Sequence, residues 1–447
     1  MYIPFGIPTL LNDNYTADED ESFAENRLCA VCANRERVLF AVLRCQSLAI
    51  ISGRPKLVLC WIKRPLDCIR EKGENVSLVW KQNSEAVAVT TSKGYILFYK
   101  VEFVPNRPVY VHKESKNPDL QRRSAELHLE TCFSSASVKL SFAVYLPTLP
   151  TKLLCYREEI IVCLKDGWLR RLLWDGSVAE DQSLIISRVP FYYDQLQSKA
   201  EYVTPETWVC DLSYSPFVGG FAVVLSDGRA ALVTTGLAPV GRQQSTSRAI
   251  WAAQIRDAVC ASVNHKNRLL LFGLKSAQIT AFTVDESTGA LNLVYSIDLV
   301  TEFSLESSSL VGGIKCIRWS PCGTVMAVSC ETRGLSVYTA FGSLQWSSLN
   351  EITRLEPELN HVISLEWGVE GCDLWFCTSK ESHCQSQLAC VSFYRSASIG
   401  NPLMSLSGSV VLLSDDHILV SPPAASRGPT QVSSHSHWNV IQVSSSS

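Results

Sequence analysis

The sequence predicts an all-β fold, a seven-bladed β-propeller, on the strength of two observations. First, a half-apolar stretch leads through a small turn into an alternating strand, and a glycine turn leads into a second strand, most clearly in residues 76–103 and 314–341. Second, apolar residues at helical spacing are scarce. Such a unit cannot bury its apolar faces alone, so its recurrence indicates a closed array of small sheets.

The repeat can be followed along most of the chain. Seven units cover residues 37–64, 76–103, 137–176, 207–236, 258–299, 314 onward and 362–397. Their average of about 50 residues exceeds the ~40–45 of a typical four-stranded blade, because insertions at 105–123 and 177–205 lengthen the chain. Ring closure would pack each blade against its neighbours and leave only short sheet edges.

Glycine turns separate the strands within these units. Four dipeptides place glycine between two strand runs: Lys93-Gly94, Asp166-Gly167, Asp227-Gly228 and Arg333-Gly334. Glycine supplies the positive φ that a tight hairpin turn requires. Residues 285–289 (DESTG) are expected to form a further hairpin loop.

The turns between the first two strands of each unit resemble those of WD repeats. The clearest is Trp319-Ser320-Pro321-Cys322-Gly323, and residues 80–83, 214–216 and 367–371 occupy equivalent places. The Trp-Asp dipeptide occurs once, at Trp174-Asp175, two residues later than the usual register, and no Gly-His pair is present. The propeller is therefore expected to be of a divergent WD type.

The first and last residues of the repeat units define the expected domain organisation. Residues 1–36 are expected to be an amino-terminal segment with an acidic stretch at 18–21, and residues 37–397 the propeller. Residues 398–420 are expected to form a closing or bridging hairpin, and residues 421–447 a Ser- and Pro-rich, partly disordered tail. The tail ends on a strand, HWNVIQV, without a sheet partner in this sequence, so the chain is expected to be cut off inside a further structure.

Composition excludes several classes of function. The net charge of -3 gives no basic field for nucleic acid, and no apolar run reaches the length of a membrane span. The start of the chain lacks the features of a signal peptide. The 17 cysteines lie mainly in apolar strand segments, as expected of buried free thiols in the reducing cytosol.

Candidate chemical groups are weak. The Cys29 and Cys32 pair lacks nearby partner ligands, so packing beside a strand is favoured over a metal or redox site. The same choice holds for a loose cluster of Cys372, Cys377, Cys384, Cys390 and His383. No nucleophile elbow or phosphate-binding glycine loop occurs, and the adjacent carboxylates Glu158-Glu159 and Asp415-Asp416 would point to opposite faces of a strand.

The sequence therefore predicts no catalytic, cofactor-binding or metal-binding residue and singles out no partner-binding residue. The pairs Arg122-Arg123 and Arg170-Arg171 are expected to be solvated surface charge. Six tryptophans in strand contexts are expected to pack between blades, with interface anchoring as the alternative: Trp61, Trp168, Trp208, Trp251, Trp346 and Trp375. A propeller enzyme remains a third hypothesis, because the fold itself excludes no activity.

Several segments resemble the amino-terminal propeller of the Ric-one family, the large subunit of the Ric-one/Rgp-one guanine nucleotide exchange complex. The segments are residues 40–59, 94–101, 219–234, 267–291, 317–342 and 365–376, together with the opening Met1-Tyr2. The sequence HWNVIQVSSS resembles the first strand of that family's second propeller. The matches are collinear over nearly the whole chain.

The resemblance implies a non-catalytic, cytosolic scaffold subunit that is recruited to Golgi membranes through its partners. With an Rgp-one-type partner subunit it would promote GDP release from a Rab-six-class GTPase in retrograde endosome-to-Golgi transport. Family members continue into a second propeller and a long helical region, so this chain is expected to be a truncated form. The alternative is a WD-repeat scaffold of another vesicle coat or tethering assembly, in which the long loops at 105–123 and 177–205 would be the first places to look for a partner surface.

Overall fold

The computed structural model describes most of the repeat region and short parts of both ends. The described residues are 2–4, 8–11, 27–53, 56–105, 133–179, 183–194, 199–216, 218–235, 247–305, 312–332, 334–349, 359, 361–379, 386–395, 410–414, 417–420 and 439–442. The chain divides into two compact units, one joining Met1–Ile3 to Tyr394–Ser447 and the other comprising Pro4–Phe393.

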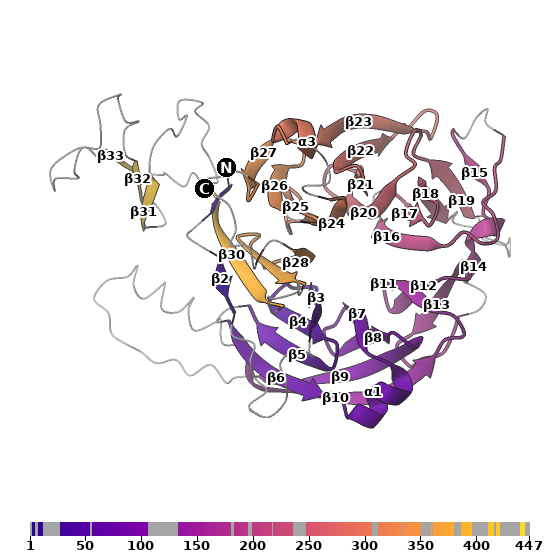
Figure 1. Ribbon diagram of the computed structural model, residues 1–447, viewed down its shortest axis with the longest axis horizontal. Helices are drawn as coiled ribbons and strands as arrows, with labels where there is room; N and C mark the ends of the chain where they lie inside the picture. Colours follow the sequence, from indigo (N-terminus) through magenta and orange to yellow (C-terminus); the bar gives the residue numbers. More distant parts are fainter. Residues whose placement is uncertain are drawn as a thin grey trace. The chain divides into compact units, whose positions relative to one another are not determined.

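The larger unit is a ring of antiparallel sheets (Figure 1). The first sheet holds β3 (Leu28–Ala33), β4 (Leu39–Arg44), β5 (Ser47–Ser52) and β6 (Leu57–Lys63). The second holds β7 (Asn75–Trp80), β8 (Ala86–Thr91), β9 (Tyr95–Pro105) and β10 (Phe133–Tyr145). The third holds β11 (Pro150–Tyr156), β12 (Glu159–Leu164), β13 (Trp168–Leu173) and β14 (Leu184–Ile185).

The remaining sheets follow the same order. The fourth holds β16 (Val209–Ser215), β17 (Gly220–Leu225), β18 (Ala230–Thr235) and β19 (Ser247–Trp251), and the fifth β20 (Ala258–Asn264), β21 (Leu269–Leu274), β22 (Gln278–Val284) and β23 (Leu291–Asp298). The sixth holds β24 (Ile314–Trp319), β25 (Val325–Cys330), β26 (Leu335–Thr339) and β27 (Leu344–Ser347). The seventh holds β28 (Val362–Trp367), β29 (Asp373–Thr378) and β30 (Leu388–Arg395).

The first strand of each sheet is the innermost, and these strands close the ring. Among the described residues β3, β7, β11, β16, β20, β24 and β28 contact one another in this order, and β28 contacts β3. Each of the seven carries a β-bulge at its second residue, which increases the local strand twist. The predicted seven-bladed propeller is confirmed.

The seventh sheet takes its outer strand from the beginning of the chain. The short strand β2 (Thr9–Leu10) pairs antiparallel with β30, Thr9 opposite Cys390 and Leu10 opposite Ala389. The Leu11 amide extends this ladder by donating to the Leu388 carbonyl at 2.9 Å. The first sheet also begins at Leu28, ahead of the predicted boundary at 37. The amino-terminal segment therefore contributes to the ring.

One predicted boundary between units is wrong. The third unit was expected to begin near residue 137, with residues 105–123 as a loop between blades. The structure instead pairs β10 with β9, from Tyr145 opposite Tyr95 to Phe133 opposite Pro105, so β10 is the outer strand of the second sheet. The long polar stretch between the two strands resembled a blade boundary, although it separates two neighbours in one sheet.

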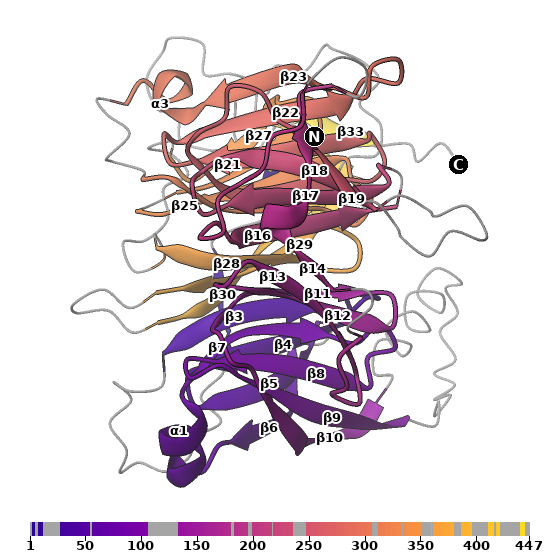
Figure 2. The ribbon, with the colours of Figure 1, turned by 90° about the vertical axis from the view of Figure 1, so that its right-hand side faces the viewer.

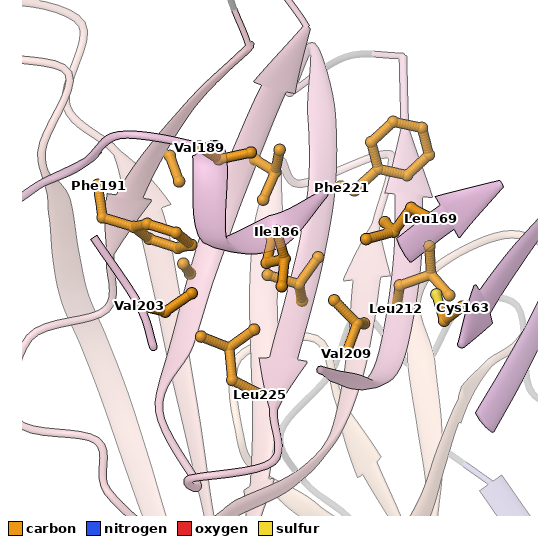
Figure 3. Packing of buried hydrophobic residues seen from close by; sticks show 14 of the residues in the cluster. Cys163, Leu169, Ile186, Val189, Phe191, Val203, Val209, Leu212, Phe221 and Leu225 are labelled. Carbon is orange, nitrogen blue, oxygen red and sulfur yellow. The ribbon is translucent and has the colours of Figure 1, made fainter. Parts of the chain in front are cut away.

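The described parts of the insertion at 177–205 pack onto the ring. It supplies β14 to the third sheet, a 3-10 turn at Ile186–Arg188, and β15 (Phe191–Tyr192), which pairs parallel with β19 of the fourth sheet. The Phe191 ring stacks on Trp251 at 4.1 Å between centroids, and the Trp251 Nε1 donates to Glu201 Oε2 at 3.1 Å. Figure 3 shows Ile186, Val189 and Phe191 inside the buried cluster that joins the third and fourth sheets.

The predicted packing of tryptophans between blades is confirmed for four of the six. Trp375 on β29 stacks on Phe40 of β4 at 4.1 Å, and Trp346 on β27 meets Phe393 of β30 at 5.5 Å. Trp251 belongs to the buried cluster that joins the third and fourth sheets, and the half-buried Trp168 packs against the cluster that joins the second and third. Trp208 is half-buried, and Trp61 on the outer strand β6 is 41% exposed. A strand context alone does not separate an inner strand from an outer one.

The predicted glycine turns have the expected backbone where the structure describes them. Gly94, Gly167, Gly228 and Gly334 all have positive φ, while Arg333 lies outside the described residues. A Cβ on Gly228 would lie 2.1 Å from the Arg256 carbonyl oxygen, so this position requires glycine for space as well as for φ. Residues 285–289 connect β22 to β23, as predicted for a hairpin loop.

Helices are short and peripheral among the described residues. The helix α1 (Leu66–Lys72) follows β6 at the edge of the ring (Figure 2), and α3 (Leu299–Glu302) is capped by the Asp298 side chain. Arg64, 3% exposed, holds the segment around α1 by donating to the carbonyls of Gly73 at 2.7 Å and Cys68 at 3.1 Å. No described helix has the length and apolar character needed to cross a membrane.

The smaller unit contains a separate sheet. Its strands are β31 (Val410–Ser414), β32 (His417–Val420) and β33 (Asn439–Gln442), and β1 (Tyr2–Pro4) begins in the same unit. The prediction that the last strand lacks a partner is wrong, because Asn439–Gln442 pairs antiparallel with β32. The hairpin of β31 and β32 has an edge at β32 to which this strand can pair, and the sequence pattern did not indicate that pairing. The Ser- and Pro-rich residues 421–438 lie outside the described residues.

Candidate functional site

One face of the ring is formed by the turns between the first and second strands of the sheets. In each of these seven described turns a residue with positive φ precedes the second strand: Arg37, Ser84, Arg157, Gly219, Arg268, Gly323 and Gly371. For a residue other than glycine the left-handed region costs roughly 1–2 kcal/mol. Arginine at three of the seven positions is therefore unusual, and each guanidinium requires an explanation.

Two of these arginines have a carboxylate partner within the ring. Arg37 Nη1 lies 2.5 Å from Glu366 Oε1 and also donates to the Trp367 carbonyl at 3.1 Å. Arg268 Nη1 lies 3.5 Å from Glu286 Oε1. Arg157 has no ion pair among the described residues. Its guanidinium lies over the Tyr156 ring, 5.3 Å from the centroid.

Arg157 belongs to an aromatic cluster between the third and fourth sheets. The Arg171 guanidinium also lies 5.3 Å from the centroid of Tyr156 and forms an ion pair with Glu159 at 3.4 Å. The Tyr214 ring meets Tyr156 edge to face at 4.6 Å, and Phe221 lies 5.0 Å from Tyr214. Two cations thus share one tyrosine, a geometry in which each guanidinium interacts with the ring face.

The Tyr214 phenol remains neutral at physiological pH. Burial raises its pKa first, and the neighbouring Tyr156 hydroxyl raises it further, while Arg157 acts in the opposite sense. A neutral phenol can donate a hydrogen bond. We call the group of Tyr156, Arg157, Arg171 and Tyr214 the arginine–tyrosine cluster.

A second group of charges lies on the inner strands. Lys152 Nζ on β11 lies 2.6 Å from Asp211 Oδ1 on β16, and Asp211 Oδ2 accepts from the Ala261 amide on β20 at 2.9 Å. Cys316 first, then Glu366 and Asp211, raise the pKa of Arg318 on β24 above its usual value. With the Arg37–Glu366 pair, cations and anions alternate across the centre of the ring. This network ties several sheets together and presents no nucleophile next to a base.

Within the part of the chain that the structure describes, the cysteine groups noted in the sequence do not form a ligand set. None of the 15 cysteines there is in a disulfide, and those residues contain no group of three or more His, Cys, Asp or Glu that could hold a metal ion. Burial raises the pKa of both Cys29 and Cys32 to about 12, so both remain protonated thiols. Of the second predicted cluster, Cys384 and His383 lie outside the described residues.

Buried thiols should make the protein sensitive to alkali. Burial raises the pKa of Cys330 to about 12 and that of Cys390 to about 11, and both side chains are 1% exposed. As the pH rises, these thiols lose their protons in the unfolded chain before they do so in the folded protein. The stability that they contribute is therefore intact below pH ~9 and is lost as the pH rises toward the pKa of the folded state. Each thiol should lower the free energy of unfolding by about 1.4 kcal/mol per pH unit in this interval. Urea unfolding at pH 8 and 10 measures the slope, which should become shallower in Cys330→Ala; an unchanged slope would contradict the prediction.

The predicted insertion loops are only partly described. Of residues 105–123 the structure describes Pro105 alone, whereas the described parts of residues 177–205 pack on the third and fourth sheets as shown above. The arginine–tyrosine cluster was not predicted. The sequence signals were the carboxylates Glu158-Glu159, which were expected to point to opposite faces of a strand, and the pair Arg170-Arg171, which was interpreted as solvated charge. Arg157 itself was not singled out.

Comparison with known proteins identifies the family. The chain is 32% identical over 459 residues to a guanine nucleotide exchange factor subunit of Caenorhabditis elegans, a match that covers 99% of this chain and 30% of the relative. It is 26% identical to the human guanine nucleotide exchange factor subunit RIC1 over 93% of this chain and 32% of the relative. The chain belongs to the RIC1 family. The resemblance seen in the sequence is thus confirmed.

The RIC1 relatives are much longer than this chain, which spans about a third of their length. No protein-family model matches the chain. Among solved structures, the β-propeller domain of Cps50 (Swd1) from Myceliophteria thermophila superposes with a TM-score of 0.52 over 82% of this chain and 96% of that domain. At 12% identity this similarity concerns the fold alone.

Proposed function

We propose that this chain is a non-catalytic scaffold portion of a guanine nucleotide exchange factor subunit, which acts with an Rgp-one-type partner on a Rab-six-class GTPase in retrograde endosome-to-Golgi transport. The observation that carries the proposal is the family relationship. The curated relatives are named guanine nucleotide exchange factor subunits, and the matches extend over 93–99% of this chain.

Exchange itself requires no covalent step from this chain. An exchange factor releases GDP because it binds the nucleotide-free GTPase more tightly than the GDP-bound form, so differential binding provides the driving force. A closed ring with seven turns on one face is suited to this role, since rigid scaffolds present recognition loops in fixed positions. The ring would therefore contribute binding surfaces and no catalytic residue.

We place the protein in the cytosol, with recruitment to Golgi membranes through its partners. The support is that no cysteine among the described residues is in a disulfide and that several are buried, which suits a reducing compartment. Fluorescence imaging of the tagged full-length protein, with and without the partner subunit, tests the recruitment. Membrane localisation that persists unchanged without the partner would contradict it.

The exchange proposal is tested with the full-length subunit. Release of a fluorescent GDP analogue from the Rab-six-class GTPase should accelerate when the subunit and its partner are both present, and a GTPase of another class serves as the control. The proposal fails if the full-length subunit neither retains an Rgp-one-type partner nor accelerates release. Crosslinking that instead recovers coat or tether components would favour the alternative scaffold.

A further inference from the structure

We propose that the arginine–tyrosine cluster binds a carboxylate on an acidic segment of a partner protein. The binding group is the Arg157 guanidinium, supported by Tyr156 and Tyr214. This inference concerns one surface of the ring and holds whether or not the assembly acts on a GTPase.

Equivalent positions around the ring differ in how the arginine side chain is used. Arg37, Arg157 and Arg268 all occupy the left-handed position of the same turn, with φ of 59°, 53° and 53°. Arg37 forms a partly buried ion pair with Glu366, and Arg268 forms an exposed ion pair with Glu286. Arg157 adopts the same unfavourable backbone, but its guanidinium contacts the Tyr156 ring and the Tyr214 hydroxyl and has no carboxylate partner among the described residues. An unfavourable backbone that brings a guanidinium to the surface without an ion pair is a reason to look for function.

The charged groups around Arg157 are more positive than negative. Lys81 and Glu158 both act electrostatically on Cys155, next to Tyr156, so both belong to this neighbourhood. Together with Arg157 and the Arg171–Glu159 pair, three positive groups face two negative ones. The Arg171 charge is already engaged by Glu159, and Arg157 is exposed. An incoming anion would therefore meet the Arg157 guanidinium first, where a charge-assisted and potentially bidentate pair can form.

The residues beneath Arg157 preorganise its guanidinium. Tyr156 is 9% exposed, and its ring fixes one face of the Arg157 guanidinium. Beneath it, Tyr156 and Phe221 belong to the buried cluster that joins the third and fourth sheets, in which Figure 3 shows Phe221 close to Leu169 and Leu212. The half-buried Tyr214 adds a neutral hydroxyl beside the guanidinium. Arginine and tyrosine on a rigid base are the residues most enriched in binding hot spots.

An acidic segment is the occupant that this chemistry fits. The guanidinium fork matches a carboxylate, and the flanking tyrosines can pack against the aliphatic stem of a glutamate. A phosphate group is the other anion that arginine recognises, and we make it an outcome of the test.

The probe is a fluorescein-labelled peptide of eight glutamates, titrated into the full chain at low salt and followed by anisotropy. The control peptide has eight glutamines. We expect the glutamate peptide to bind at least tenfold more tightly than the glutamine peptide, and Arg157→Gly to remove about tenfold of that affinity, as the loss of one charge-assisted bond predicts. Arg157→Lys should recover part of it.

The matched control is Arg268→Gly, which relieves the same backbone conformation in the equivalent turn and should leave binding unchanged. Thermal unfolding separates binding from structure, since Arg157→Gly should be at least as stable as the parent protein. Equal loss in Arg157→Gly and Arg268→Gly, or no preference for glutamate over glutamine, would overturn the proposal. So would tighter binding of a phosphoserine peptide of equal charge that survives Arg157→Gly.

Discussion

Replacing Trp375 by alanine should lower the free energy of unfolding by about 3–5 kcal/mol, the range for removing a buried tryptophan. Trp375 is fully buried, and its ring stacks on Phe40 at 4.1 Å with an interplanar angle of 12°. This contact joins β29 of the seventh sheet to β4 of the first, where the ring closes. The cavity left by alanine would therefore form at the seam that holds the two ends of the ring together.

Urea unfolding followed by circular dichroism measures this effect, with Trp61→Ala as the matched control. Trp61 lies on the outer strand β6 and is 41% exposed, so its loss should change stability by less than about 1 kcal/mol. Trp375→Phe should recover part of the lost stability because it retains an aromatic ring. Equal effects of Trp375→Ala and Trp61→Ala would contradict the prediction, because the contact between the first and seventh sheets would then stabilise the protein no more than an exposed tryptophan does.

Replacing Asp211 by alanine should also lower the free energy of unfolding by about 3–5 kcal/mol, because it leaves a partly buried cation without its partner. Asp211 is 8% exposed, pairs with Lys152 at 2.6 Å and accepts from the Ala261 amide at 2.9 Å. Both groups would lose a partner in one substitution. The change removes one negative charge from the alternating network at the centre of the ring.

Asp67→Ala is the control for the second prediction, since Asp67 is almost fully exposed and pairs with Arg70 at 3.6 Å on the surface of α1. Its removal should not change the urea midpoint measurably. Asp211→Asn should fall between the parent and Asp211→Ala, because an amide oxygen can still accept from Ala261. If Asp211→Ala were as stable as the parent, the inner charges would not hold the sheets together.

The repeat pattern and its turns were predictable because they are local. Glycine at position 228 and the segment from Trp319 to Gly323 carry their structural meaning within a few residues, and both form the turns expected of them. The outer strand β10 was assigned to the wrong blade because its pairing partner β9 lies across a long polar stretch. A two-residue strand such as β2 carries too little sequence pattern to be recognised at all.

The arginine–tyrosine cluster and the charged network on the inner strands were not predictable, because their members are far apart in the sequence. Lys152, Asp211 and Arg318 each appear as an isolated polar residue within an apolar strand, and only ring closure brings them together. Similarly, the sequence does not show that Arg157 and Arg268 have different partners. The difference is that Arg268 finds Glu286 in a neighbouring turn, whereas Arg157 meets a tyrosine ring.

The pairing of β2 with β30 has a consequence for the order of folding during synthesis. Six sheets are assembled from strands close together in the sequence and can form as the chain emerges, whereas Thr9 pairs with Cys390, about 380 residues later. At ~5–20 residues per second, the amino-terminal strand waits roughly 20–80 s for its partner. During that interval the start of the chain is unpaired, and the outer edge of the seventh sheet stays open from the time its strands emerge until β2 pairs with β30. The nascent protein is therefore a candidate for protection by chaperones until the ring closes.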